Sequence, residues 1–340
     1  MWSNKRKFLV IRFSSIGDIV LTTPAIRCLK LQVPDAEVHF LTKKSFRAVT
    51  EANPYIDRLH YFDNNLSELI RELKKEEFDA VIDLHKNFRT AVIKYQLKVP
   101  ALTYKKLSWQ KFLLTKLGIN LMPQRHITDR CMDTIAPLGV VNDEKGLDYF
   151  IPDHQQVKVS DIPLSHSAGF IAVVIGASFY TKKLPVELLQ QLCSSIDFPI
   201  VLIGGPDDAE EGIQIASVDP LKIYNSCGKF SLNESADLVR KSALVISHDT
   251  GFQYIACAFN KKVLAVWGGT SPLLDVEPYY GKQQMQQQSS LPAYQNFIVP
   301  GLSCQPCSNY GTRSCPRGHF KCMRNQDIPL IAATANAWVK

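Results

Sequence analysis

Short apolar, β-branched segments alternate with longer segments of helical periodicity in the first half of the chain. The predicted strands are 7–13, 37–41, 58–61, 80–83 and 101–104. The predicted helices between them include 18–32, 66–76 and 87–97. Strands that alternate with helices form βαβ units around a parallel sheet. The first half therefore predicts a doubly wound α/β domain.

The same alternation restarts in the second half, after residues 142–168, which are polar and lack clear periodicity. The predicted strands are 170–175, 200–203, 221–224, 244–247 and 263–267. The predicted helices are 186–196, 207–216, 232–241 and 251–259. The Gln-rich region 281–296 predicts a surface loop.

Two tandem Rossmann-like domains follow from this pattern, and a length of 340 residues favours two domains over one core. We expect one Rossmann-like domain at 1–155, a second at 165–326 and a C-terminal helix at 327–340. Ligands of doubly wound sheets bind beyond the carboxyl ends of the strands. Two such domains facing each other would enclose a central cleft.

The excess of positive over negative charge lies in the first half of the chain. Residues 1–150 hold 24 Lys and Arg against 17 Asp and Glu, whereas the remainder holds 15 of each. This excess indicates either a solvated basic surface or a face for an anionic partner such as a phosphorylated lipid. The basic residues are spread out and no nucleic-acid-binding module is present, which argues against nucleic acid.

Membrane insertion and secretion are not expected. The apolar runs are shorter than the roughly 18 residues that a spanning helix needs. The N-terminal apolar run is short and reads as a first strand rather than a secretory signal. We therefore expect a cytoplasmic protein, and the basic excess of its first half would hold it near an anionic membrane face without insertion.

Asp18 is the first candidate for chemistry, in the loop after the first predicted strand. Small residues precede it, and an apolar helix follows it. Asp18 could be a helix cap, or a general base that deprotonates a bound hydroxyl. A GxGxxG fingerprint is lacking throughout the chain, which weakens a dehydrogenase interpretation.

Two loops of the second half combine hydroxyl groups, glycines and charges. Ser178 and Lys182 lie in a loop that a proline ends, and this loop is either a phosphate site or a basic surface loop. Asp249, Thr250 and Gly251 precede a predicted helix, where backbone N–H groups favour a diphosphate. Glu234 could bind a ribose, or could close a capping box with Ser231.

The nine cysteines fall into two groups. Cys28, Cys131, Cys193, Cys227 and Cys257 occur singly in apolar surroundings and are expected to be core thiols. The other four form the pattern Cys304-X2-Cys307-X7-Cys315-X6-Cys322, with His319 nearby. A structural zinc, disulfides or unligated thiols in a loop are all compatible with this spacing.

The sequence resembles the heptosyltransferases of glycosyltransferase family 9 over nearly its whole length. The most specific segment is SSIGDIVLTTPAIRCLK at 14–30. GASFYTKKLP, GKFSLNESADLV, SHDTGFQYIACAF and VWGGTSP follow in the family's order.

The resemblance implies a GT-B fold, with acceptor binding by the domain at 1–155 and nucleotide-sugar binding by the domain at 165–326. It also implies inverting, metal-independent transfer of heptose from ADP-heptose to a lipid-linked lipopolysaccharide inner-core acceptor, without a cofactor. Asp18 falls on the family's proposed catalytic base, and Lys182 on the lysine that neutralises the donor diphosphate. The remaining donor-binding matches are Ser178, Glu234, Asp249, Thr250 and Gly251. Arg89 is a candidate for acceptor binding, and no metal ligand is assigned.

Two positions depart from the family pattern. Tyr254 stands where the family usually has histidine, and Leu184 where it often has tryptophan. The histidine change leaves open a transferase for another nucleotide sugar in cell-envelope polysaccharide synthesis. It also leaves open a non-catalytic protein that binds a sugar nucleotide or zinc.

Overall fold

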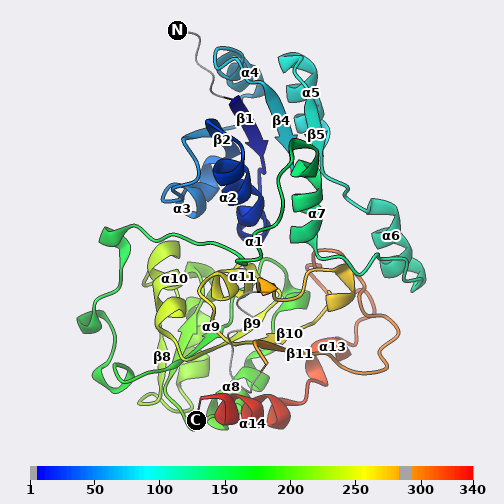
Figure 1. Cartoon of the computed structure of the whole chain (residues 1–340). Coiled ribbons are helices and arrows are strands. Elements are labelled where there is room, and N and C mark those ends of the chain that lie inside the picture. The colour runs from blue at the N-terminus through cyan, green and yellow to red at the C-terminus, as the bar shows by residue number, and fades with distance from the viewer. Residues whose placement is uncertain (1–5, 283–291, 340) are drawn as a thin grey trace. The chain divides into compact units, whose positions relative to one another are not determined.

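The computed structural model describes residues 6–282 and 292–339, which form two compact units. The first unit comprises residues up to 106 together with 125–150, and the second comprises 107–124 and 151 onward. Each unit contains one parallel sheet with helices packed on it, as the sequence pattern predicts. Figure 1 shows both units coloured along the chain.

The sheet of the first unit has the strand order β3-β2-β1-β4-β5, and all its pairings are parallel. Its strands are β1 (Arg6–Ile11), β2 (Ala36–Lys43), β3 (Arg58–Phe62), β4 (Ala80–Asp83) and β5 (Ala101–Thr103). Its helices are α1 (Ile16–Val20), α2 (Thr23–Gln32), α3 (Arg47–Thr50), α4 (Leu66–Lys74), α5 (Phe88–Leu97) and α7 (Ile127–Ile135). Helix α2 packs on α7 and α4 packs on α5, so paired helices cover the sheet.

The predicted helix 18–32 is in fact two helices, α1 and α2. Pro24 lies at the start of α2, where its missing N–H costs nothing, but it would clash with a continuous upstream turn. The hydroxyls of Thr22 and Thr23 donate to the carbonyls of Ile19 and Val20 at 2.7 Å and satisfy the end of α1. The break ends α1 after five residues, so Asp18 lies in a single helical turn.

The sheet of the second unit has the order β11-β10-β9-β6-β7-β8, again all parallel. Its strands are β6 (Ile171–Val174), β7 (Ile200–Ile203), β8 (Ile223–Asn225), β9 (Leu244–His248), β10 (Val263–Val266) and β11 (Tyr294–Phe297). Its longer helices are α8 (Val186–Ser194), α9 (Ala209–Ala216), α10 (Leu232–Lys241), α11 (Gly251–Ala258) and α14 (Ile328–Trp338). Shorter helical segments are α6 (Ser108–Phe112), the π-helical η2 (Leu113–Leu117), η7 (Tyr180–Lys182) and α13 (Lys321–Arg324).

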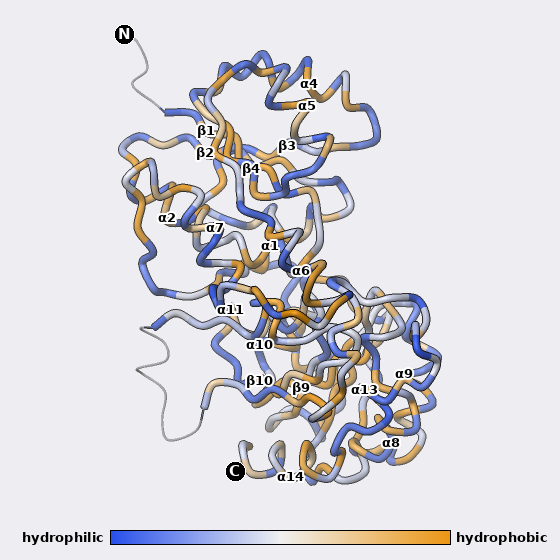
Figure 2. Tube along the Cα trace, turned by 90° about the vertical axis from the view of Figure 1, so that its right-hand side faces the viewer, coloured by the Kyte–Doolittle hydropathy of each residue, from blue (hydrophilic) through white to orange (hydrophobic). Residues whose placement is uncertain are grey.

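The core of each unit follows from strands that are apolar on both faces, as in β6 and β7, where every residue is buried. Figure 2 shows the hydrophobic colour on strands of both sheets. Helix α14 adds Ile331, Ala335 and Trp338 to the core that α8 also enters, so the predicted C-terminal helix packs on the second unit. None of the described helices has the length and apolar character that crossing a membrane requires.

Strand β11 was missed by the sequence analysis. Tyr294, Gln295 and Asn296 are only partly buried at the sheet edge, so this strand lacks the apolar run that marks the others. The predicted loop 281–296 is therefore wrong at residues 294–296. Its Gln-rich part, 283–290, lies outside the described residues.

Residues 107–124 belong to the second unit, although the predicted boundary placed them in the first. Leu114 and Met122 pack on Leu274, with Leu107 and Val276 alongside. These apolar contacts are long-range in sequence, so sequence periodicity does not predict them.

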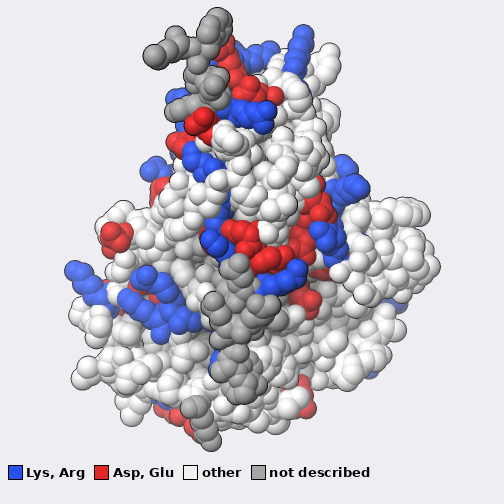
Figure 3. All heavy atoms as spheres, in the orientation of Figure 1, with Lys and Arg blue, Asp and Glu red and all other residues white. Residues whose placement is uncertain are grey.

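Basic and acidic side chains are interspersed on the face drawn in Figure 3.

Candidate functional site

The loop after β1 fixes Asp18 through two hydrogen bonds and one ion pair. Ser15 is the N-cap of α1, and its backbone N and Oγ donate to Oδ2 of Asp18 at 3.1 and 3.0 Å. Nη2 of Arg12 lies 2.6 Å from the other oxygen, Oδ1. Asp18 therefore caps the helix, as the structural alternative predicted. Its side chain is still about a quarter exposed, at 26%, so the capping role does not exclude contact with a ligand.

Arg12 is the residue that sequence reasoning missed beside Asp18. Its guanidinium is buried, and it donates to the carbonyl oxygens of Leu84 at 2.6 Å and Ser14 at 3.0 Å. Burial alone would raise the pKa of the Asp18 carboxyl, but the Arg12 charge and the Ser15 hydrogen bonds outweigh it and lower that pKa. Asp18 is therefore a carboxylate at neutral pH, the form that a general base requires.

His85 follows β4, which is the neighbour of β1 in the sheet. The imidazole meets the ring of Phe13 edge-on at 5.4 Å. Its Nδ1 is buried and lacks a hydrogen-bond partner in the described parts of the chain. Burial, and then the charges of Arg12 and Lys106, lower its pKa to about 4. A neutral imidazole thus lies within electrostatic range of Asp18, and only its place after a neighbouring strand could have indicated this.

Arg89 lies in the first turn of α5, whose start is closed by reciprocal hydrogen bonds between Asn87 and Thr90. The Arg89 side chain is exposed, and its guanidinium carbon lies 5.4 Å from the centre of the Phe62 ring. An exposed guanidinium at a helix N-terminus suits an anionic group. The loops that carry Asp18 and Arg89 follow the adjacent strands β1 and β4 at the same sheet edge.

Lys182 and Asp249, both predicted from sequence, are in direct contact in the second unit. Nζ of Lys182 lies 2.7 Å from Oδ2 of Asp249 and donates to the Asp249 carbonyl oxygen at 2.9 Å. Both side chains are largely buried. They come from the loops after β6 and β9, which are adjacent strands. The pair places a cation beside the N-terminus of α11, where Thr250 is the N-cap and Gly251 the first residue.

The neighbouring Lys183 has a separate role from Lys182. Its Nζ pairs with Asp208 Oδ1 at 2.9 Å and with Glu211 Oε2 at 2.6 Å. The next backbone N–H, of Leu184, donates to Nε2 of the buried His248 at 3.0 Å. Burial lowers the His248 pKa to about 3, so this imidazole stays neutral and holds the loop in place.

The remaining predicted donor residues differ in what holds them. Ser178 is exposed in the loop after β6. Glu234 accepts the backbone N–H of Ser231 at 2.7 Å, and Ser231 Oγ accepts from Glu234 N at 3.4 Å. Glu234 thus closes the capping box of α10, as the structural alternative predicted. A partly buried carboxylate of this kind retains capacity to accept further hydrogen bonds.

Tyr254 stands at the position of the usual family histidine, and its side chain makes structural contacts. It is buried in α11, and its hydroxyl donates to the Val276 carbonyl oxygen at 2.6 Å. The phenol oxygen therefore already has a backbone partner, in contrast to the ring nitrogens that a histidine would present.

The cysteine-rich segment 304–322 braces the loop that follows β10. Nε2 of Gln305 donates to the carbonyl oxygens of Trp267, Gly268 and Thr270 at 3.1, 2.8 and 3.2 Å. Thr312 exchanges hydrogen bonds with Thr181, the residue before Lys182. The segment therefore supports the loop that carries Lys182.

The thiols of this segment are all free. Sγ of Cys304 lies 3.8 Å from Nε2 of His319. In the described residues, 6–282 and 292–339, His39, His60 and Glu76 form a group that could hold a metal ion. One possible ligand atom of each lies within 4.8 Å of those of the other two. Those atoms have protein partners: His39 Nδ1 and His60 Nε2 are 2.9 Å apart, and Arg58 pairs with Glu76 at 2.7 Å.

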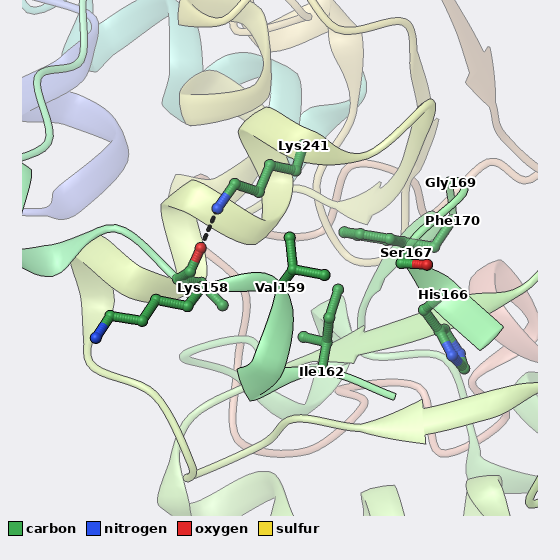
Figure 4. A pocket seen from close by; sticks show the side chains of 9 residues that line it. Lys158, Val159, Ile162, His166, Ser167, Gly169, Phe170 and Lys241 are labelled. Carbon is green, nitrogen blue, oxygen red and sulfur yellow. Dashed lines mark hydrogen bonds between the residues drawn. The ribbon is translucent and has the colours of Figure 1, made fainter. Parts of the chain in front are cut away.

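A cavity of about 210 Å³ lies in the second unit, between the lead-in segment and α10. Figure 4 shows Val159, Ile162 and Phe170 lining it, with the Lys241 amine bonded to the Val157 carbonyl oxygen. Lys241 also pairs with the buried Asp237 at 2.6 Å. The cavity is lined by none of the predicted site residues, so we assign it no role in donor binding.

Two α/β units, each with one parallel sheet, are the architecture of the GT-B fold. The model of glycosyltransferase family 9 (heptosyltransferase) matches residues 66–299, more than half of the chain. The chain therefore belongs to glycosyltransferase family 9, and it is a glycosyltransferase, as the sequence predicted.

Curated relatives agree with this family, and solved structures share the fold of the chain. Lipopolysaccharide heptosyltransferase 1 of Campylobacter coli is 25% identical over 291 residues, which cover 78% of this chain and 84% of the relative. The family 9 transferase structure from Veillonella parvula has a TM-score of 0.75 at 21% identity, covering 100% of this chain and 98% of its own. The E. coli ADP-heptose lps heptosyltransferase II structure has a TM-score of 0.68 at 17% identity, covering 98% of each chain.

Proposed function

We propose that this glycosyltransferase moves a heptose from ADP-heptose to a lipid-linked acceptor of the lipopolysaccharide inner core, at the cytoplasmic face of the inner membrane. The names of its relatives support the sugar and the acceptor class. The observation that carries the chemistry is Asp18, an ionised and partly exposed carboxylate whose loop holds it in one position.

In the proposed reaction, Asp18 accepts the proton of an acceptor hydroxyl as that oxygen attacks the anomeric carbon of the donor. The new carbon–oxygen bond forms as the bond from the anomeric carbon to the diphosphate oxygen breaks. Attack opposite the leaving group inverts the anomeric configuration. Arg89 would bind an anionic group of the acceptor.

The leaving diphosphate gains negative charge as it departs. Lys182 and the N–H groups at the start of α11 would stabilise that charge without a catalytic metal ion. Ser178 and Thr250 would add hydroxyl hydrogen bonds, and Glu234 would accept from the ribose. Asp249 would hold Lys182 in place and exchange its ion pair for the diphosphate when the donor binds.

A second candidate is transfer of another sugar from its nucleotide. The specific observation in its favour is Tyr254, whose hydroxyl is already bonded to the Val276 carbonyl oxygen. The donor sugar would then lack the contact that the family histidine supplies. A non-catalytic role is disfavoured because Asp18, Lys182 and Glu234 are all retained.

A thermal-shift screen over nucleotide sugars, followed by transfer assays with the stabilising compound, tests the proposal. We expect ADP-heptose to raise the melting temperature more than UDP-, GDP- or CMP-sugars at equal concentration, because a bound ligand stabilises in proportion to its affinity. A larger shift with another nucleotide sugar, followed by transfer of that sugar, would support the second candidate instead.

A further inference from the structure

Residues 107–121 present an unusually apolar surface for a short segment. Trp109, Phe112, Leu117, Ile119 and Leu121 are respectively 67%, 47%, 60%, 49% and 57% exposed. Isolated exposed apolar residues are common, but five of them between residues 109 and 121 indicate an interaction surface. We call these five side chains the α6 apolar surface.

The α6 apolar surface is distinct from the part of the segment that packs inward. Leu114 and Met122 are buried against Leu274, so the segment already contributes to its own unit. Trp109 and Phe112 are three residues apart on α6, and their rings stack with centroids 5.7 Å apart and planes 16° apart. The outward face therefore has a defined shape and is not needed for the core.

The charged side chains of the segment that carries this surface have one sign. Residues 107–124 contain Lys111 and Lys116 and no Asp or Glu. Within the α6 segment, Lys116 is exposed between Phe112 and Leu117. The surface over α6 is white in Figure 3, which is drawn in the orientation of Figure 1, so acidic groups do not cover it on that face.

Aromatic and aliphatic side chains with lysines among them are typical of segments that lie in a membrane interface. Tryptophan favours the level of the lipid headgroups, and lysines there attract anionic lipids. A second copy of this chain would bring the same cations against one another, which is unfavourable for a self-complementary contact. The charge therefore favours an anionic lipid surface as the occupant.

We propose that the α6 apolar surface docks this enzyme on an anionic bilayer, with Trp109 and Phe112 at the boundary of headgroups and acyl chains and Lys116 beside lipid phosphates. This proposal rests on the proposed function, since a lipid-linked acceptor lies in such a bilayer. It assigns the membrane contact to one short segment.

Vesicle co-sedimentation of the full chain tests the proposal. We compare wild type with the double variant Trp109→Ser and Phe112→Ser on vesicles of phosphatidylcholine and phosphatidylglycerol, and on phosphatidylcholine alone. We expect the double variant to bind the anionic vesicles on the order of tenfold more weakly or worse, because two apolar side chains that would insert into the bilayer are lost. Lys116→Gln should weaken binding about fivefold, and wild type should prefer the anionic vesicles.

The matched control is Leu221→Ser, which removes an even more exposed apolar side chain of the same unit. It should bind vesicles like wild type. All variants change exposed positions, so their melting temperatures should match that of wild type. Equal vesicle binding by wild type and the double variant would overturn the proposal. So would loss of a wild-type dimer in the double variant, without vesicle binding by wild type, because the occupant would then be a second copy.

A transfer assay on a water-soluble, deacylated acceptor separates this proposal from the proposed function. The double variant should transfer to the deacylated acceptor at the wild-type rate and lose rate only on acceptor in vesicles. Equal loss on both acceptors would contradict a docking role. Wild type that binds anionic vesicles through α6 but transfers no heptose would contradict the proposed function and leave the docking surface supported.

Discussion

The two predicted catalytic groups, Asp18 in the first unit and Lys182 in the second, are both ion-paired, but their partners are held differently. The partner of Asp18 is Arg12, a buried side chain that two backbone carbonyl oxygens anchor. The partner of Lys182 is Asp249, which is itself a predicted donor-binding residue. The Arg12 guanidinium is thus fixed by protein groups, whereas the diphosphate of the proposed donor would compete with Asp249 for Lys182.

This difference indicates two uses of charge. Arg12 lowers the pKa of Asp18, and it does so over the ordinary pH range because a buried arginine stays charged there. In the proposed function, Asp249 instead holds the Lys182 amine in position and a bound diphosphate would replace it. Variants of the residues in these two pairs can distinguish a fixed ion pair from an exchangeable one.

Asp18→Asn should have the largest effect. The amide keeps the size of the side chain but cannot accept a proton, so transfer should fall on the order of 10²–10⁴-fold. ADP binding, measured by calorimetry, should stay close to wild type, because Asp18 belongs to the other unit from the predicted donor residues. A loss of ADP binding at an unchanged melting temperature would remove the base assignment.

Lys182→Ala should have the next largest effect. The loss of one charge-assisted contact costs about 1.5–3 kcal/mol, which corresponds to roughly 10- to 150-fold weaker ADP binding. Lys183→Ala is the matched control, because its amine pairs with Asp208 and Glu211. If the two alanine variants bind ADP with equal affinity, Lys182 has no special role at the diphosphate.

The exchangeable pair makes a more specific prediction. In Lys182→Ala the largely buried Asp249 loses its cation and would repel a diphosphate. Adding Asp249→Asn to Lys182→Ala should therefore recover part of the lost ADP affinity, and a double-mutant cycle measures the coupling. Strict additivity of the two changes would show that the pair does not act as one unit.

Arg12→Met should shift the pH dependence of kcat/KM and should have a smaller effect on the rate at high pH. Arg12 lowers the Asp18 pKa, so the active carboxylate persists to lower pH in wild type. Removing the guanidinium raises that pKa, and the acid limb of kcat/KM should move to higher pH. Arg12→Lys keeps the charge and should move it less. An unmoved acid limb in a folded Arg12→Met enzyme would mean that Asp18 does not control it.

The smallest effects should separate the two roles of Glu234. Glutamine can also close a capping box, so Glu234→Gln should leave the melting temperature nearly unchanged and weaken nucleotide binding by a factor of about 3 to 10. Ser231→Ala should cost about 1 kcal/mol of stability with little change in affinity. The opposite result would make Glu234 a cap and nothing more.

The regular elements could be predicted from sequence because buried parallel strands have continuous apolar runs, as in 170–175 and 200–203. The break between α1 and α2 depends on one proline, and the helical periodicity continues across it. Strand β11 depends on its pairing with β10 and has too little apolar character of its own. Tertiary contacts decide such elements, and a single sequence does not display them.

The positions of Asp18, Lys182 and Asp249 in loops after strands could be predicted from motifs, while their roles stay predictions. Arg12 could not be predicted, because it lies at the end of an apolar segment and its role requires the carbonyl oxygen of Leu84, 72 residues away. The hydrogen bonds from Gln305 could not be predicted either, since they reach backbone atoms rather than a recognisable side-chain partner. Sequence thus shows candidate ligand contacts better than the groups that position them.

The central claim is most directly tested by the product of one reaction. The enzyme is incubated with ADP-heptose and the lipid-linked inner-core acceptor in the presence of a metal chelator, and the product is examined by mass spectrometry and NMR. We predict an acceptor that carries one added heptose, with the anomeric configuration opposite to that of the donor. No added heptose, transfer only when a divalent metal is restored, or a retained configuration would contradict the account.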